Sequence, residues 1–230
     1  MDALGFIAGL AGVITSAKLV KDSLKPKQPR PQVGAVRASR GRVRPTGQQS
    51  QPALRLGDPK SKVHRVKNID QRVSHIVQMI QKGRQDPRVR RIAVQQVSKK
   101  CGKTWCIPER DYQGEINALF NHVRRNVRYV RDSYAMDQFQ HPVRTFEFAG
   151  GDCDDYSITL GSLLQSIGYP VKLRVIQTTD APDFSHIYLL VGSPPGNRRK
   201  YISLDASVAK PAGWEAPKYM IKKVRDYEVR

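Results

Sequence analysis

The stretch that begins at Gly151 constrains the fold most, because the hydrophobic pattern changes there from helical spacing to strand-like runs. The apolar run at residues 157–167 predicts a buried helix, which acidic residues open and Gly168 closes. Three strand-like runs follow, at residues 171–177, 186–191 and 200–204. The sequence SPPGN links the last two runs as a turn. A helix followed by antiparallel strands predicts an α+β fold.

Three further helices are predicted before this stretch. Residues 68–83 place isoleucine and valine at helical spacing. Asp86 and Pro87 fit the cap and the first turn of a second helix, which runs to about residue 100. A third helix is predicted at about residues 111–127. The α+β core is therefore expected to carry N-terminal helices.

The first 66 residues differ from the rest in composition. The apolar run at residues 4–14 is shorter than the ~20 residues that span a bilayer. It predicts a short anchor helix at residues 1–24 that packs against protein, with a signal peptide or shallow membrane attachment as the alternatives. Residues 25–66 are rich in Pro, Gln and Arg and poor in large apolar residues, which predicts an extended basic linker arm.

Positive charge is concentrated in this part of the chain. Residues 1–67 hold 14 basic and 3 acidic residues, whereas residues 151–208 hold 5 and 6. The net charge of +20 therefore belongs to the arm and the flanking helices. A basic arm attracts nucleic acid or an acidic protein surface, and a solvated surface is the plain alternative. A dedicated nucleic-acid-binding protein ranks last, because the sequence contains no recognisable module of that kind.

The three cysteines are too few for a disulfide scaffold. Cys101 and Cys106 stand close together in CGKTWC, and a single pair lacks the four ligands of a structural zinc site. We interpret this pair as packing or incidental, with a redox-dependent disulfide as the alternative. Asp154 and Asp155 are interpreted as helix-start groups rather than calcium ligands, and no metal site or cofactor is predicted.

The third cysteine stands where a nucleophile would be activated. Cys153 lies in GGDCDD at the expected start of the buried helix, and a helix N-terminus lowers the pKa of a thiol. His186 begins the strand-like run HIYLLV, and Asp205 ends the next one, YISLD. Adjacent antiparallel strands bring such residues side by side. The order predicts a nucleophile, a base and a carboxylate that orients the base. Each residue alone has a structural explanation.

The segments FQHPVRTFEFAGGDCDDYSITLGSLLQSIGYPVKLRV, SHIYLLV and YISLDAS together resemble the transglutaminase-like (papain-like) cysteine protease superfamily. The resemblance covers residues 108–208 and implies a papain-like core, in which the nucleophile begins a helix packed on an antiparallel sheet. It implies Cys153, His186 and Asp205 as the catalytic residues. By analogy it offers Gln140 as an oxyanion-hole candidate, with the backbone N–H of Cys153 as another.

The resemblance implies acyl transfer at an amide bond through a thioester, by a peptidase, an amidase or a transamidase. Small transglutaminase-like proteins of bacteriophages are similar in their compact core, which implies a virion or host-cytoplasm setting. The partners expected are a protein or peptide substrate and a larger assembly held through residues 1–66, with nucleic acid possible and a membrane not expected. The alternative is a structural virion protein that uses the fold as a binding module.

On either side of the core at residues 108–208, we expect residues 67–107 to form a helical extension and residues 209–230 to form a basic C-terminal tail.

Overall fold

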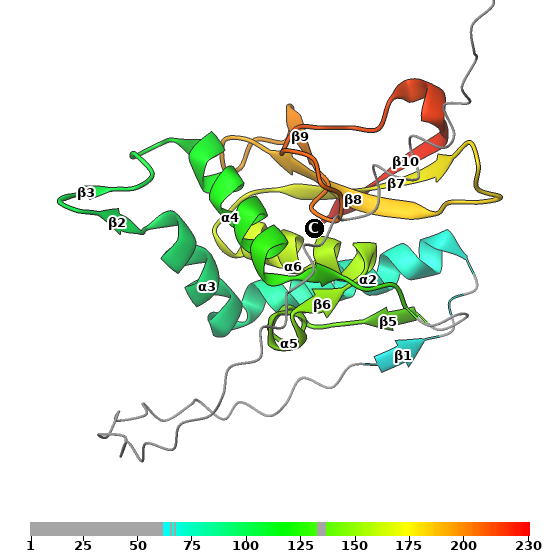
Figure 1. Cartoon of the computed structure of the whole chain (residues 1–230), viewed down its shortest axis with the longest axis horizontal. Helices are drawn as coiled ribbons and strands as arrows, with labels where there is room; N and C mark the ends of the chain where they lie inside the picture. The colour runs from blue at the N-terminus through cyan, green and yellow to red at the C-terminus, as the bar shows by residue number, and fades with distance from the viewer. Residues whose placement is uncertain (1–61, 65, 67, 133–136) are drawn as a thin grey trace, which may run out of the picture. The chain divides into compact units, whose positions relative to one another are not determined.

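The computed structural model describes residues 62–64, 66, 68–132 and 137–230 (Figure 1). The predicted anchor at residues 1–24 lies outside the described residues, as does most of the predicted arm at residues 25–66. The prediction of an extended linker is wrong at the end of the arm, because β1 (Lys62–His64) pairs antiparallel with β5 (Asp137–Phe139). In the described part of the chain, no helix combines the length and the apolar character needed to cross a membrane.

Three predicted helices form close to their expected limits. They are α2 (Ile69–Gln85), α3 (Pro87–Val97) and α4 (Tyr112–Asn126). Side chains cap all three N-termini: Asn68 accepts from the N–H of Gln71, Asp86 from that of Arg88, and Asp111 from that of Gly114.

The predicted buried helix is α6 (Cys153–Ser166), which starts four residues earlier than the apolar run suggested. It lies between α2 and the main sheet (Figure 1). Gly83 of α2 permits this packing, because a Cβ atom there would lie 2.3 Å from Oγ of Ser162. Residues of α2, α3 and α4 share one hydrophobic core with α6, so the predicted helical extension packs into the same core.

The three predicted strands form an antiparallel sheet together with a fourth strand. The strands are β7 (Val171–Thr178), β8 (His186–Gly192), β9 (Tyr201–Leu204) and β10 (Ile221–Val229), in the order β10-β7-β8-β9. Alternate residues of β7 and β8 are buried against α6, including Val175 and Ile187. The predicted α+β architecture is confirmed.

The predicted basic tail at residues 209–230 is wrong for its last part, because β10 is an edge strand. Its charged side chains are exposed and pair across to β7: Arg174 with Asp226 at 2.7 Å, and Lys172 with Glu228 at 2.8 Å. Charged residues are a common feature of edge strands. A short 3-10 helix, η1 (Lys218–Met220), precedes β10.

Several short elements complete the fold. They are β2 (Lys100–Cys101), β3 (Thr104–Trp105), β4 (Arg128–Tyr129), α5 (Pro142–Phe148) and β6 (Gly150–Gly151). The hairpin of β2 and β3 holds a disulfide between Cys101 and Cys106. The expected packing role for these two cysteines is therefore wrong, since hairpin pairing brings their sulfur atoms into bonding distance.

Candidate active site

The local structure around Cys153 follows from its position as the first residue of α6. Asp152 is the N-cap, and its side chain accepts from the N–H groups of Asp154 at 3.0 Å and Asp155 at 3.4 Å. The N–H of Cys153 has no acceptor among the described residues, as expected for a first-turn donor. This helix end therefore offers a free N–H and a partial positive charge next to the thiol.

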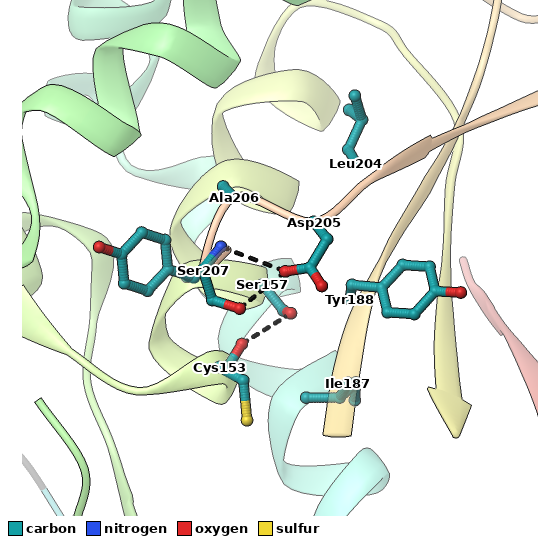
Figure 2. Close-up of a pocket in the computed structure, with 9 residues that line it drawn as sticks. Cys153, Ser157, Ile187, Tyr188, Leu204, Asp205, Ala206 and Ser207 are labelled. Carbon is teal, nitrogen blue, oxygen red and sulfur yellow. Dashed lines mark hydrogen bonds between the residues drawn. The ribbon is translucent and has the colours of Figure 1, made fainter. Parts of the chain in front are cut away.

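The thiol of Cys153 faces the start of strand β8. The side chain is buried, its Sγ–H donates to Oδ1 of Asp154 at 3.8 Å, and the backbone N–H of Ile187, the neighbour of His186, favours the ionised sulfur. Figure 2 shows Cys153 in a recess that Asp205 and Ser207 also line. The walls of the recess lie too close together to admit a water molecule. A substrate must therefore widen this recess to reach the sulfur.

The sheet side of the recess carries a histidine–carboxylate pair. Nε2 of His186 lies 2.6 Å from Oδ2 of Asp205. Leu189 pairs with Leu204 across β8 and β9, and continuing this register places Asp205 diagonally opposite His186. Asp205 also accepts from Ser207, from Oγ at 2.7 Å and from the N–H at 3.2 Å, as drawn in Figure 2.

These contacts settle the charge of the carboxylate. Burial opposes ionisation, but His186 and the hydrogen bonds from Ser207 hold the pKa of Asp205 below its usual range. An ionised Asp205 accepts the proton on Nε2, which leaves Nδ1 of His186 as the basic nitrogen. Of the three residues that the sequence singled out, Cys153 and Asp205 line one recess and His186 contacts Asp205, and their catalytic roles stay predictions.

The pKa of the Cys153 thiol is shifted upward, opposite to that of Asp205. Burial raises the pKa of Cys153 well above its usual value, and the neighbouring carboxylates of Asp154 and Asp152 raise it further. The guanidinium of Arg72 and the N–H of Ile187 oppose this rise. Cys153 is therefore a neutral thiol at pH 7 in this structure, and a base must take its proton during a reaction.

Arg72 of α2 is the cation that faces these carboxylates. Its Nε lies 2.7 Å from Asp154, and its Nη2 lies 3.8 Å from Asp152 and 3.6 Å from Asp137. Burial nevertheless raises the pKa of Asp152 to about 8. Asp152, Cys153 and Asp154 have ligand atoms within 4.8 Å of one another and could hold a cation, although Arg72 already supplies positive charge there.

Gln140 lies on the other side of this helix end. Its backbone N–H and its Nε2 each donate to Asp155 at 2.8 Å, and Nε2 also donates to the carbonyl of Gly150 at 3.2 Å. Burial raises the pKa of Asp155 to about 7. Both hydrogens of the Gln140 side-chain amide are used by these contacts. Its oxyanion role stays a prediction, as does that of the N–H of Cys153.

Two residues that contact the site, Arg72 and Ser207, were not predicted from the sequence. Arg72 is separated from Asp154 by 82 positions, and no local pattern connects them. Ser207 follows Asp205 by two positions, which is the spacing at which an aspartate accepts from a nearby backbone N–H. The second contact therefore had a recognisable signal in the sequence, and the first had none.

Residues 106–214 match the family model of the transglutaminase-like superfamily. This segment is a transglutaminase-like core. The match contains Cys153, His186 and Asp205, and the resemblance seen in the sequence is confirmed. A transglutaminase-like core supports a cysteine-dependent enzyme in general terms.

The chain is similar to several solved structures of low sequence identity. A candidate protease from Parabacteroides distasonis is 12% identical with a TM-score of 0.43, over 64% of this chain and 30% of that one. A candidate cysteine protease from Cytophaga hutchinsonii is 16% identical with a TM-score of 0.40, over 58% and 42%. LapG from Legionella pneumophila is 16% identical with a TM-score of 0.38, over 60% and 73%. The matched part thus spans less than half of the first two proteins. The sequence matches none of the curated proteins.

Proposed function

We propose that this chain catalyses cysteine-dependent acyl transfer at an amide bond of a protein or peptide. The observation that carries the proposal is the contact of 2.6 Å between His186 and Asp205, beside a free cysteine at the start of a helix. A thiol whose pKa is raised needs a base at the moment of attack. His186, oriented by Asp205, is that base.

The reaction proceeds through a thioester. Sγ of Cys153 attacks the amide carbonyl while Nδ1 of His186 takes the thiol proton, and the C–S bond forms. The free N–H of Cys153 donates to the carbonyl oxygen as it gains negative charge. His186 then gives its proton to the amide nitrogen, which leaves as an amine when the C–N bond breaks. Asp205 stays ionised and stabilises the protonated ring.

The second half of the reaction releases the acyl group. If water attacks the thioester, His186 takes its proton, Cys153 regains a hydrogen, and the chain acts as a peptidase or amidase. If a primary amine attacks instead, a new amide forms and the chain acts as a transamidase. Both outcomes use the same residues, so the acceptor that reaches the recess decides between them.

The biological setting is a separate part of this proposal. We infer a bacteriophage protein, in the virion or the host cytoplasm, held in an assembly through residues 1–66, with the basic arm contacting nucleic acid or protein. This inference rests on the resemblance of the compact core to phage-encoded proteins and on the 14 basic residues at positions 1–67. Mass spectrometry of purified virions from a host that produces the chain tests it, and absence from the particles would contradict it.

The second candidate function is a structural one. The buried thiol and the narrow recess favour a binding module in which the acyl-transfer residues no longer react. The two candidates differ in the behaviour of Cys153 toward a small electrophile. An enzyme needs His186 to activate the sulfur, whereas a structural module leaves the sulfur as an inert buried thiol.

Alkylation by iodoacetamide between pH 5 and pH 9 separates the two. Cys101 and Cys106 are joined in a disulfide, so the label reports on Cys153. We expect His186→Ala to lower the rate at pH 7 about 100-fold, in the range typical of general-base loss. His122→Ala is the matched control, because His122 lies on α4 and contacts Phe146. Equal rates for wild type and His186→Ala would refute the enzyme. Turnover of casein with and without a dansylated primary amine then distinguishes hydrolysis from transamidation.

A further inference from the structure

Within the described residues, strand β4 pairs with β6 on one edge and has no partner strand on the other. The N–H of Arg128 donates to the carbonyl of Ala149, and the N–H of Val130 donates to that of Gly151, both at 2.9 Å. Alternate residues of a strand direct their backbone groups to opposite edges, so the N–H and C=O of Tyr129 face away from β6. Neither group has a partner among the described residues. A free N–H and C=O on a strand form a ready site for another strand.

This free edge lies beside the candidate nucleophile. Tyr129 pairs in register with Gly151, two residues before Cys153. The ring centroid of Tyr129 lies 6.4 Å from that of Tyr156, which lines the recess together with Cys153. Burial and then the closeness of Cys153 and Asp152 raise the pKa of Tyr129 to about 12. A chain bound along this edge would therefore pass next to the thiol.

The side chains of the edge are apolar and basic. Tyr129 is 42% exposed and Val130 is 56% exposed, which is unusual for large apolar residues this close to a buried site. The segment from Arg124 to Arg131 holds four arginines and no acidic residue. Arg128 and Arg131 are exposed, whereas the carboxylates around Cys153 are buried. A ligand that approaches β4 thus meets positive charge and exposed apolar surface.

We propose that the edge of β4 binds an extended, acidic segment of a polypeptide substrate, which pairs its backbone with Tyr129 and presents a carbonyl to Cys153. Binding by strand addition takes affinity from main-chain hydrogen bonds and specificity from alternate side chains. Alternating acidic and apolar residues in the ligand match the arginines and the exposed apolar side chains. The last step, reaction at Cys153, rests on the proposed function, and the binding does not.

Two other occupants fit the edge less well. The first 61 residues of this chain hold 11 basic and 3 acidic residues, so their net positive charge is repelled by Arg128 of β4 and by Arg131, which follows it. A single-stranded nucleic acid matches the arginines and can stack on an exposed aromatic ring. A nucleic acid, however, has no alternating N–H and C=O groups that could pair with the backbone of Tyr129. The peptide accounts for all three features of the edge.

The test measures binding without catalysis, by fluorescence polarisation on Cys153→Ser. The probe is a fluorescein-labelled dodecapeptide of alternating Glu and Val, compared with the Lys–Val peptide of the same length. We expect the acidic peptide to bind at least tenfold more tightly. N-methylation of alternate backbone nitrogens of the probe should weaken binding about tenfold, since it removes the donors that a strand partner uses. Arg131→Glu and Tyr129→Ala should each weaken it about fivefold or more.

The matched control is Lys223→Glu on β10, at the edge of the main sheet away from β9, and it should leave the Kd within twofold. Thermal unfolding of each variant shows that it is folded. Equal affinity for the acidic and basic peptides, indifference to N-methylation, or tighter binding of a twelve-nucleotide single strand that displaces the probe would each overturn the proposal.

The two proposals fail in different ways. Peptide binding by Cys153→Ser, combined with a wild-type chain that never reacts, would refute the proposed function and keep the strand-edge site. Turnover of casein by the wild type, without binding of the acidic peptide to Cys153→Ser, would refute the strand-edge site and keep the enzyme.

Discussion

The two sides of the recess have opposite effects on the ionisation of their acidic groups. The helix side is the start of α6, and the sheet side is formed by the ends of β8 and β9. On the helix side, burial raises the pKa of Cys153 well above its usual value and that of Asp152 to about 8. On the sheet side, His186 and Ser207 hold the pKa of Asp205 below its usual range against the effect of burial. One buried carboxylate is thus kept ionised, while its counterpart across the recess is kept protonated around neutral pH.

The difference follows from the neighbouring charges. Asp205 faces a histidine ring and two donors from Ser207, whereas Asp152 lies close to the carboxylates of Asp154 and Asp155, with Arg72 as the opposing charge. Charge in a buried site is tolerated only when it is paired and hydrogen-bonded. In the proposed reaction, the sheet side would therefore supply the charge that assists proton transfer. The helix side supplies position, through the cap and the free N–H.

The largest effect is expected on the sheet side, from Asp205→Asn. The amide keeps the shape of the carboxylate but removes the charge that stabilises a protonated His186, so kcat/KM should fall about 100-fold or more. Ser207→Ala is the graded companion: it removes the Oγ donor at 2.7 Å and keeps the backbone donor, so a loss of about threefold to tenfold is expected. Casein turnover across pH 5–9 measures both. An Asp205→Asn enzyme with wild-type kcat/KM would show that the sheet side supplies no catalytic charge.

A smaller effect is expected on the helix side, from Arg72. Arg72→Met removes the cation that opposes the rise in the pKa of Cys153, so the pH profile of alkylation should move to higher pH and the rate at pH 7 should fall about tenfold. Arg72→Lys keeps the charge and loses the second contact of the guanidinium, so it should recover part of the rate. This makes Arg72 a positioning residue.

If Arg72 only stabilises the fold, we expect a different result. Loss of its contact with Asp154 would then lower the melting temperature of both variants but leave the pH profile of the folded protein unchanged. Arg91→Met is the matched control, because it makes the same substitution at an exposed position of α3. It should match the wild type in both measurements. An unshifted profile in Arg72→Met would therefore remove Arg72 from the site.

The fold was predictable wherever local periodicity determined it. Helices α2, α3 and α4 follow from apolar spacing and from caps such as Asn68 and Asp86, which act over three residues or fewer. Strand β10 was missed because its residues alternate weakly and only Val229 is buried. Its place in the sheet depends on pairing with β7, which lies about 50 positions earlier in the chain. Distant pairing leaves no local trace in a charged edge strand.

The candidate site divides in the same way. Cys153, His186 and Asp205 could be named because each marks the start of a helix, the start of a strand or the end of a strand. The contact from Arg72 could not be named, since it joins α2 to α6 through tertiary packing. The effect of the N–H of Ile187 on the pKa of Cys153 could not be predicted either, because any residue supplies a backbone N–H. Residue type therefore predicted the candidate reacting groups, but not the groups that set their charge.

The smallest effect concerns the stability of the helix side. The raised pKa of Asp152, about 8, means that the folded chain binds more protons than the unfolded chain between about pH 4 and pH 8. Stability is therefore lost as pH rises through this window, and Asp155, with a pKa of about 7, adds to the loss. The lowered pKa of Asp205 acts in the opposite direction only below about pH 4, so it does not offset the loss.

Asp152→Asn tests this part of the comparison. The asparagine keeps a side-chain oxygen for the N–H of Asp154, so the cap of α6 is preserved. The free energy of unfolding of the variant at pH 8 should exceed that of the wild type by about 1 kcal/mol or more, and the difference should be smaller near pH 5. Urea denaturation at both pH values measures this difference. A wild type that is more stable at pH 8 than at pH 5, with no gain in the variant, would mean that Asp152 is ionised and well paired. The two sides of the recess would then treat charge alike.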